Sequence, residues 1–171
     1  MKGLKVSSSP IQISAEITET VANTFTQDQI DLTLNVLDNE VFVVTQINLD
    51  VSAPDMPAAG LTNSVDATVS TTARATVGSI ADSNVLGAAN RVLLVGAAPG
   101  EPTAQFDRED PLFAAISEDY LGIIATNNAF LNIQGTGNGN AKTVRCRIYG
   151  FRATATAAVY AALVQSELLS A

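Results

Sequence analysis

The sequence predicts an all-β fold: an antiparallel sandwich of two sheets, with the size of a single jelly roll of about eight strands. We also expect short helices in loops and one C-terminal helix. Apolar and polar residues alternate with a period of two over several segments, which is typical of half-buried strands. Polar turns containing glycine or proline separate these segments. Charged residues make up only 15% of the chain, whereas small and β-branched residues are abundant.

The length of 171 residues fits a single jelly-roll domain over residues 1–171. Residues 1–10 are expected to form an extended N-terminal arm, and residues 156–169 a helix. An immunoglobulin-like sandwich is the alternative, but such domains are usually shorter, with about 100 residues. No apolar run is long enough to span a bilayer, and residues 1–10 lack the apolar core of a signal peptide. We therefore expect a chain made in the cytoplasm, without a signal peptide or a membrane span.

The N-terminal half contains four expected strands. Ile11–Ile17 alternates cleanly, and so does Gln29–Val36, where four apolar residues share one face. Val41–Val51 begins apolar on both faces, and Ser64–Thr76 alternates with small side chains. The short polar turn at Leu37–Glu40 predicts that the second and third strands form a β-hairpin.

In the C-terminal half, Gly78–Ala89 is compatible with either a short helix or a loop. Asp110 as N-cap and Pro111 at the first helical position predict a short helix that continues through Leu112–Ile116. Gly135–Asn140 is predicted to be a flexible hairpin loop, since it lacks the Lys-Ser/Thr pair of a phosphate-binding loop. Four further strands are expected, at Arg91–Val95, Tyr120–Ala125, Phe130–Gln134 and Lys142–Arg152.

The composition excludes most enzyme chemistry. The chain contains no histidine, so it holds no Ser-His-Asp or Cys-His nucleophile and no imidazole metal ligand. A single cysteine excludes an intrachain disulfide. We therefore predict that the protein is not an enzyme and uses no cofactor. The net charge of −8 also disfavours general nucleic-acid binding, which needs clustered lysine and arginine.

Acidic residues gather in one loop region, at Asp107, Glu109 and Asp110, with Glu118 and Asp119 nearby. Clustered carboxylates suit a calcium ion. Their spacing does not match an EF-hand, and Asp110 already serves as a helix cap. We favour solvated loop acids and predict no metal site.

The strand Lys142–Arg152 carries four of the nine basic residues and the only cysteine. A period of two places Val144, Cys146 and Ile148 on an apolar face that we expect to close the core. Two interpretations of the basic residues stay open. They form ion pairs with carboxylates of a neighbouring strand or subunit, which we favour, or they contact packaged nucleic acid weakly through phosphates. The candidate residues are Lys142, Arg145, Arg147 and Arg152.

The C-terminal helix is the second candidate surface. A terminal helix that follows a sheet either docks on its own subunit or bridges to a neighbouring one, and the sequence favours neither. Its candidate interface residues are Tyr160, Leu163, Val164 and Leu168.

Several segments resemble small coat proteins of uncultured marine viruses. They are Phe25–Leu32, Leu37–Val44, Ser70–Arg74, Ile123–Asn127 and Tyr160–Leu169. The resemblance covers most of the chain and implies a single jelly-roll major capsid subunit of a virion. Such a subunit would assemble with copies of itself into an icosahedral shell. The chain departs from many coat proteins in lacking a basic N-terminal arm.

A different class of function remains open as the alternative. A non-enzymatic β-sandwich could act as a binding or decoration module on a virion surface, with Asp107–Asp119 as its contact loop. Such a module would bind a glycan or a preformed shell and would not assemble by itself.

Overall fold

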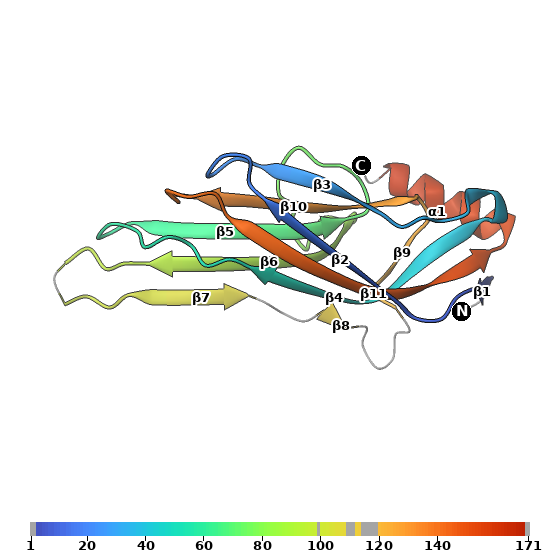
Figure 1. The fold of residues 1–171 in the computed structure, drawn as a ribbon, viewed down its shortest axis with the longest axis horizontal. Helices are drawn as coiled ribbons and strands as arrows, with labels where there is room; N and C mark the ends of the chain where they lie inside the picture. The colour runs from blue at the N-terminus through green and yellow to red at the C-terminus, as the bar shows by residue number, and fades with distance from the viewer. Residues whose placement is uncertain (1–2, 99, 109–111, 114–119, 170–171) are drawn as a thin grey trace.

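The computed structural model describes residues 3–98, 100–108, 112–113 and 120–169. Two antiparallel sheets face each other in an elongated sandwich, with one helix at the end where the N-terminus lies (Figure 1). The six-stranded sheet contains β1 (Leu4–Val6), β2 (Ile11–Thr18), β4 (Glu40–Val51), β8 (Leu112–Phe113), β9 (Gly122–Ile124) and β11 (Thr143–Ala155). The five-stranded sheet contains β3 (Thr26–Asp31), β5 (Thr62–Ser70), β6 (Val85–Leu94), β7 (Ala104–Arg108) and β10 (Asn128–Thr136).

The strand order confirms the predicted jelly roll. In the six-stranded sheet β2, β11, β4 and β9 are successive neighbours, and in the five-stranded sheet the order is β3, β10, β5 and β6. The chain changes sheet after β2, β3, β4, β7, β9 and β10, so most neighbours in sequence lie in opposite sheets. Eight strands connected in this way form the two Greek keys of a jelly roll.

Two predicted hairpins are wrong for the same reason. The turn at residues 37–40 connects β3 of the five-stranded sheet to β4 of the six-stranded sheet, and β3 pairs with β10 instead. The loop at 135–140 likewise connects β10 to β11 across the sandwich. A short polar turn between two alternating segments predicts two strands, but it does not determine which sheet each strand joins.

Contacts from distant segments fix the first of these crossings. Thr33 has φ of 50°, a left-handed conformation that is uncommon for a β-branched residue. Asn127 binds the residues on either side of Thr33. Its carbonyl accepts the N–H of Leu32 at 2.9 Å, and its side-chain oxygen accepts the N–H of Leu34 at 2.6 Å. The chain therefore turns away from β10 after Asp31 and enters the other sheet.

Among the described residues, the loops contain less helix than predicted. Within the expected helix after Pro111, Leu112–Phe113 form strand β8, which pairs with β4, and its other residues lie outside the described ranges. Residues 79–84 form turns that lead into β6. The short loop helix found among the described residues is a 3₁₀ turn, η1 (Val36–Asp38).

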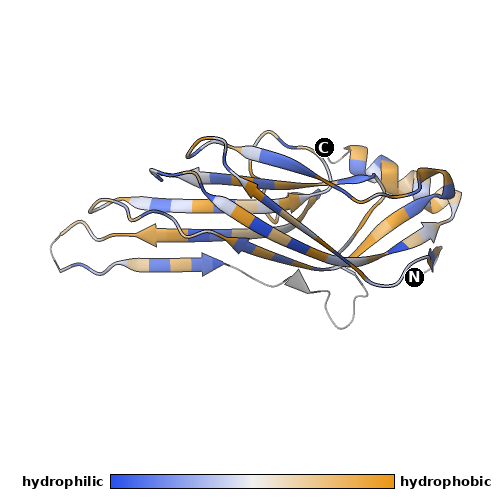
Figure 2. Ribbon diagram, in the orientation of Figure 1, coloured by the Kyte–Doolittle hydropathy of each residue, from blue (hydrophilic) through white to orange (hydrophobic). Residues whose placement is uncertain are grey.

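The main core lies between the two sheets. Val144, Cys146 and Ile148 of β11 are buried in it, as the alternation predicts. Figure 2 shows the alternation of apolar and polar residues along the strands. Other fully buried members are Leu32, Phe42, Val44, Val51, Val65, Ala67, Val69, Ile124, Ala129, Leu131 and Ile133.

A second apolar cluster lies on the outer face of the six-stranded sheet, beneath α1 (Ala157–Leu169). Val41 and Val43 of β4 belong to this cluster, whereas Phe42 and Val44 point into the main core. The helix thus explains why this stretch of β4 is apolar on both faces. It also covers only one end of the sheet, leaving the outer face farther along β2, β11 and β4 open (Figure 1).

Candidate functional site: the outer face of β2, β11 and β4

Two of the four candidate basic residues point away from this outer face. The ammonium group of Lys142 is buried at the end of the sandwich and lies 2.5 Å from Asp55 Oδ1. Arg152 extends to the β3–β4 crossing, where it donates hydrogen bonds to the Leu32 carbonyl at 3.1 Å and to Thr33 Oγ1 at 2.6 Å. Both residues therefore connect segments of this chain to each other.

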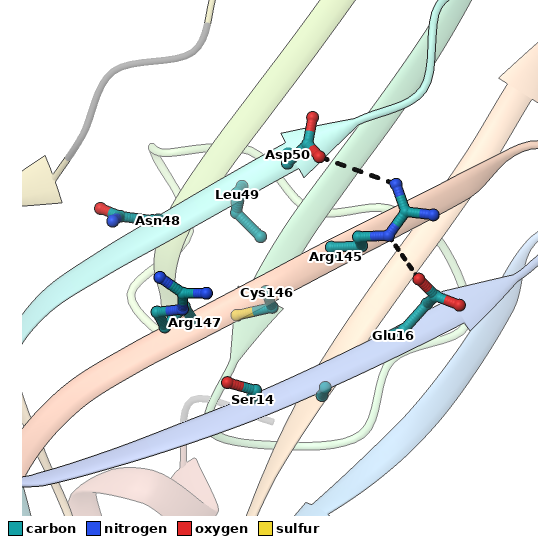
Figure 3. A pocket seen from close by; sticks show the side chains of 9 residues that line it. Ser14, Glu16, Asn48, Leu49, Asp50, Arg145, Cys146 and Arg147 are labelled. Carbon is teal, nitrogen blue, oxygen red and sulfur yellow. Dashed lines mark ion pairs between the residues drawn. The ribbon is translucent and has the colours of Figure 1, made fainter.

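Arg145 and Arg147 do lie on the outer face, each between polar neighbours on β2 and β4. The strand register places Arg145 between Glu16 and Asp50, three residues that we call the charged row. The adjacent row, two residues along β11, contains Arg147 between Ser14 and Asn48, and we call it the polar row (Figure 3).

The charged row is neutralised largely within itself. Arg145 Nε lies 2.5 Å from Glu16 Oε2, and Arg145 Nη1 lies 3.7 Å from Asp50 Oδ2 (Figure 3). All three side chains are exposed, so water screens these pairs and each contributes little to stability. Two carboxylates and one guanidinium leave the row with one net negative charge.

A groove of about 530 Å³ runs between the two rows, lined also by Ala15, Leu49 and Cys146. The Cys146 side chain packs into the main core, and its burial raises the pKa of the thiol to about 12. The thiol therefore stays protonated at neutral pH and is a poor nucleophile. The chemistry available in the groove is consequently hydrogen bonding and charge.

The polar row offers several free hydrogen-bond donors. Gln12 Nε2 donates to Ser14 Oγ at 3.3 Å, and Gln46 Nε2 donates to Asn48 Oδ1 at 2.9 Å. Each bond uses one lone pair of a polar-row oxygen, whereas the Ser14 hydroxyl hydrogen and the Asn48 amide hydrogens form no hydrogen bond within the described residues. Arg147, which is exposed, forms no ion pair within the described part of the chain. Three donor groups thus lie side by side at the edge of the groove.

The candidate helix residues divide between two environments. Tyr160, Leu163 and Val164 are partly buried against the chain's own sheet, and the Tyr160 hydroxyl donates to the Ala125 carbonyl at 3.3 Å. Leu168, in contrast, is exposed. The helix therefore docks on its own subunit through one face and presents a second face, which includes Leu168, to the outside.

Glu167 joins α1 to the segment between β9 and β10, and it is not among the predicted site residues. Its buried carboxylate accepts the backbone N–H groups of Ala125 and Thr126 at 3.0 and 2.9 Å. Burial raises the pKa of Glu167, and these two hydrogen bonds oppose that shift. The signal was present in the sequence, because Glu167 is the only charged residue of the helix Ala157–Leu169.

A polar junction at the opposite end of the sandwich was also missed. It joins the loops after β2, β4 and β10, of which only the last, at residues 135–140, has a prediction of its own. Glu19 accepts the N–H of Gly135 at 2.7 Å and of Lys142 at 2.9 Å, and Asp55 Oδ2 accepts the N–H groups of Gly139 and Asn140, each at 2.9 Å. The loop that was predicted to be flexible is thus held by two carboxylates.

The junction predicts a loss of stability in acid. The hydrogen bond from Lys142, together with those from Asn140, lowers the pKa of Asp55 from 3.8 to about 2. Because the folded pKa lies below the unfolded one, Asp55 stabilises the fold above about pH 4, and this contribution disappears as the pH falls toward 2. Urea unfolding should therefore show a difference between wild type and Asp55→Asn that shrinks from pH 5 to pH 2.5. A difference that stays constant over this range would contradict the assignment.

Of the five acidic residues weighed as a calcium site, the structure describes Asp107. Asp107 lies 3.8 Å from Arg91 as an ion pair, whereas Glu109, Asp110, Glu118 and Asp119 lie outside the described ranges. No group of three or more potential metal ligands occurs among the described residues. Within the same residues, none of the helices is both long and apolar enough to cross a membrane.

Comparisons with known proteins find similarity among solved structures. No protein-family model matches the sequence, and no curated protein matches it. Among solved structures, the chain is similar to one from Desmodium yellow mottle tymovirus, at 13% sequence identity and a TM-score of 0.30, over 88% of this chain and 90% of that chain. Because this TM-score is low, the jelly-roll assignment rests on the strand order and register described above and not on this similarity.

Proposed function

We propose that this chain is a non-enzymatic structural protein, a jelly-roll capsid subunit that assembles with copies of itself into the icosahedral shell of a virion. Jelly rolls occur mainly in viral capsids, lectins and cupins. The chain has no histidine for an imidazole metal site and no tryptophan to stack against a sugar ring. Among these classes, a capsid subunit therefore fits the composition best, in agreement with the resemblance of the sequence to small viral coat proteins.

The proposal rests mainly on the positions of the large apolar side chains that are exposed to solvent. Leu37 on η1 is 93% exposed, Leu169 on α1 is 87% exposed, Met56 after β4 is 72% exposed and Phe106 on β7 is 61% exposed. Their elements lie at both ends of the sandwich and along the free edge formed by β7 (Figure 1). A shell subunit touches several neighbours through different surfaces, whereas a binding module needs one contact patch.

The outer face of α1 fits such a contact. Glu167, its only charged residue, is buried, so the exposed side of the helix carries no charge. Leu168 and Leu169 are exposed there, while Tyr160, Leu163 and Val164 attach the helix to its own sheet. Apart from Gln165 and Ser166, the exposed residues of the helix are alanine and leucine, and an apolar helix face of this kind is normally covered. We propose that a neighbouring subunit covers this one.

Light scattering coupled to size-exclusion chromatography tests the proposed function. The chain, expressed alone and purified, should elute as large particles or as defined trimers, pentamers or hexamers that associate further on concentration. A stable monomer at high concentration and at every salt concentration would contradict the proposal. If that monomer bound to glycans or to a preformed shell, it would be a decoration module instead.

A further inference from the structure

We propose that the polar row is a binding site for one carboxylate group of a second copy of this chain, with Arg147 as its charged centre. The inference rests on the proposed self-assembly and identifies a contact within it. Arg147, Ser14 and Asn48 belong to three adjacent strands, so the sheet itself fixes their spacing.

The hydrogen bonds within the sheet prepare these groups as donors. Gln12 and Gln46 each donate to the oxygen atom of a polar-row neighbour, and the Ser14 hydroxyl hydrogen and the Asn48 amide hydrogens stay available to other acceptors. A guanidinium group presents parallel N–H donors that match the two oxygens of a carboxylate. The row therefore offers an acceptor-only ligand one cation and two neutral donors.

The charged row favours a single carboxylate over a nucleic-acid backbone. Glu16, Arg145 and Asp50 together carry one negative charge, and Arg147 carries one positive charge beside them. A polyanion lying along the groove would meet two carboxylates as well as the cation. The net charge of −8 would repel it further. One carboxylate, placed on Arg147 at the far side of the groove, avoids most of this repulsion.

The chain itself supplies suitable ligands, since it has 17 acidic residues and only 9 basic ones. Asp28 and Asp31 are exposed on β3, which is an edge strand of the five-stranded sheet. Neither forms an ion pair within the described residues. The polar row and this edge belong to different surfaces of the molecule and have opposite charge. Contact between them would be heterologous, the kind that builds closed rings and shells.

Removing the cation tests the site against a matched control. Arg147→Gln should raise the concentration at which half of the protein assembles by about tenfold, which corresponds to about 1.4 kcal/mol. Lys5→Gln removes the same charge from an exposed lysine of β1 and should leave that concentration unchanged within about twofold. Arg147→Lys should have an intermediate effect, because an ammonium group lacks the paired donors. The midpoint of thermal unfolding should be the same in all three variants, because Arg147 and Lys5 are both exposed.

Cross-linking identifies the ligand. Particles assembled from equal amounts of light and ¹⁵N-labelled Arg147→Lys chains are treated with a carbodiimide, which joins an amine to a carboxylate in direct contact. Mass spectrometry should find position 147 linked to an aspartate or glutamate in mixed light–heavy pairs. Links only within one chain, to Glu16 or Asp50, would overturn the proposal, and so would the absence of any link from position 147.

The outcomes separate this inference from the proposed function. If wild type and Arg147→Gln assemble at the same concentration, the carboxylate site is wrong and self-assembly stands. If Arg147→Gln assembles normally but loses co-purifying nucleic acid, the groove binds phosphate and the inference is likewise overturned. If wild type never assembles, both proposals fail.

Discussion

Replacing Gly150 by alanine is expected to lower the free energy of unfolding by about 3 kcal/mol. The register between β11 and β4 shifts at this point: Tyr149 pairs with Gln46 and Gly150 with Val44, which leaves Thr45 as the extra residue of a β-bulge. A Cβ atom on Gly150 would lie 2.6 Å from Phe42 Cε1 and still closer to the carbonyl oxygen of Val43. Backbone and a fully buried ring cannot both move aside, because the main core packs against Phe42.

Gly139→Ala provides the matched control for this prediction. A Cβ atom there would meet only Asp55 Oδ2, at 3.7 Å, which is ordinary contact. We expect its free energy of unfolding in urea to stay within about 0.5 kcal/mol of wild type. Equal effects of the two substitutions would show that the close packing at the bulge does not matter for stability.

Asn138→Ala should cost about as much, about 3 kcal/mol, because it removes three hydrogen bonds that a buried side chain makes to backbone groups, each contributing about 1 kcal/mol. The Asn138 side chain accepts the N–H of Asp55 at 2.8 Å and donates to the carbonyls of Ser64 at 2.8 Å and Thr136 at 3.3 Å. Within the described residues, no second side chain is hydrogen-bonded to these three backbone groups. Urea unfolding should therefore give a much lower midpoint.

The control for this second prediction is Asn140→Ala, two residues farther along the same loop. The Asn140 side chain is exposed and makes one hydrogen bond, to Asp55 Oδ2 at 3.0 Å. Its loss should cost less than about 1 kcal/mol. If Asn138→Ala were no more harmful than Asn140→Ala, the junction would not be holding the three loops together.

Alternation alone predicted much of the fold. It located β2, β4 and β11 to within two or three residues, and it placed Val144, Cys146 and Ile148 in the core. A helix was expected at residues 156–169 and is found at Ala157–Leu169. These features depend on local spacing, because a strand or helix buries whichever face its own sequence makes apolar.

The crossings between sheets could not be predicted in this way. Whether β3 and β4 form a hairpin depends on Thr33 adopting a left-handed conformation, and on Asn127 reaching the chain from 93 residues away. The loop before β11 depends in the same way on Glu19 and Asp55. Such long-range hydrogen bonds leave no periodic trace in the sequence.

The candidate basic strand shows both the strength and the limit of the pattern. A period of two already separates Arg152 from Arg145 and Arg147, and the structure places it toward the β3–β4 crossing. Spacing cannot show that Glu16 and Asp50 would satisfy Arg145 while Ser14 and Asn48 flank Arg147. That difference comes from the register of two partner strands.

Negative-stain electron microscopy of the purified wild-type chain tests the central claim most directly. We expect closed particles of uniform diameter, formed without any other protein, across a range of concentration and salt. A field without particles, from protein that sediments as a monomer at high concentration under the same conditions, would contradict the account of this jelly roll as a shell subunit.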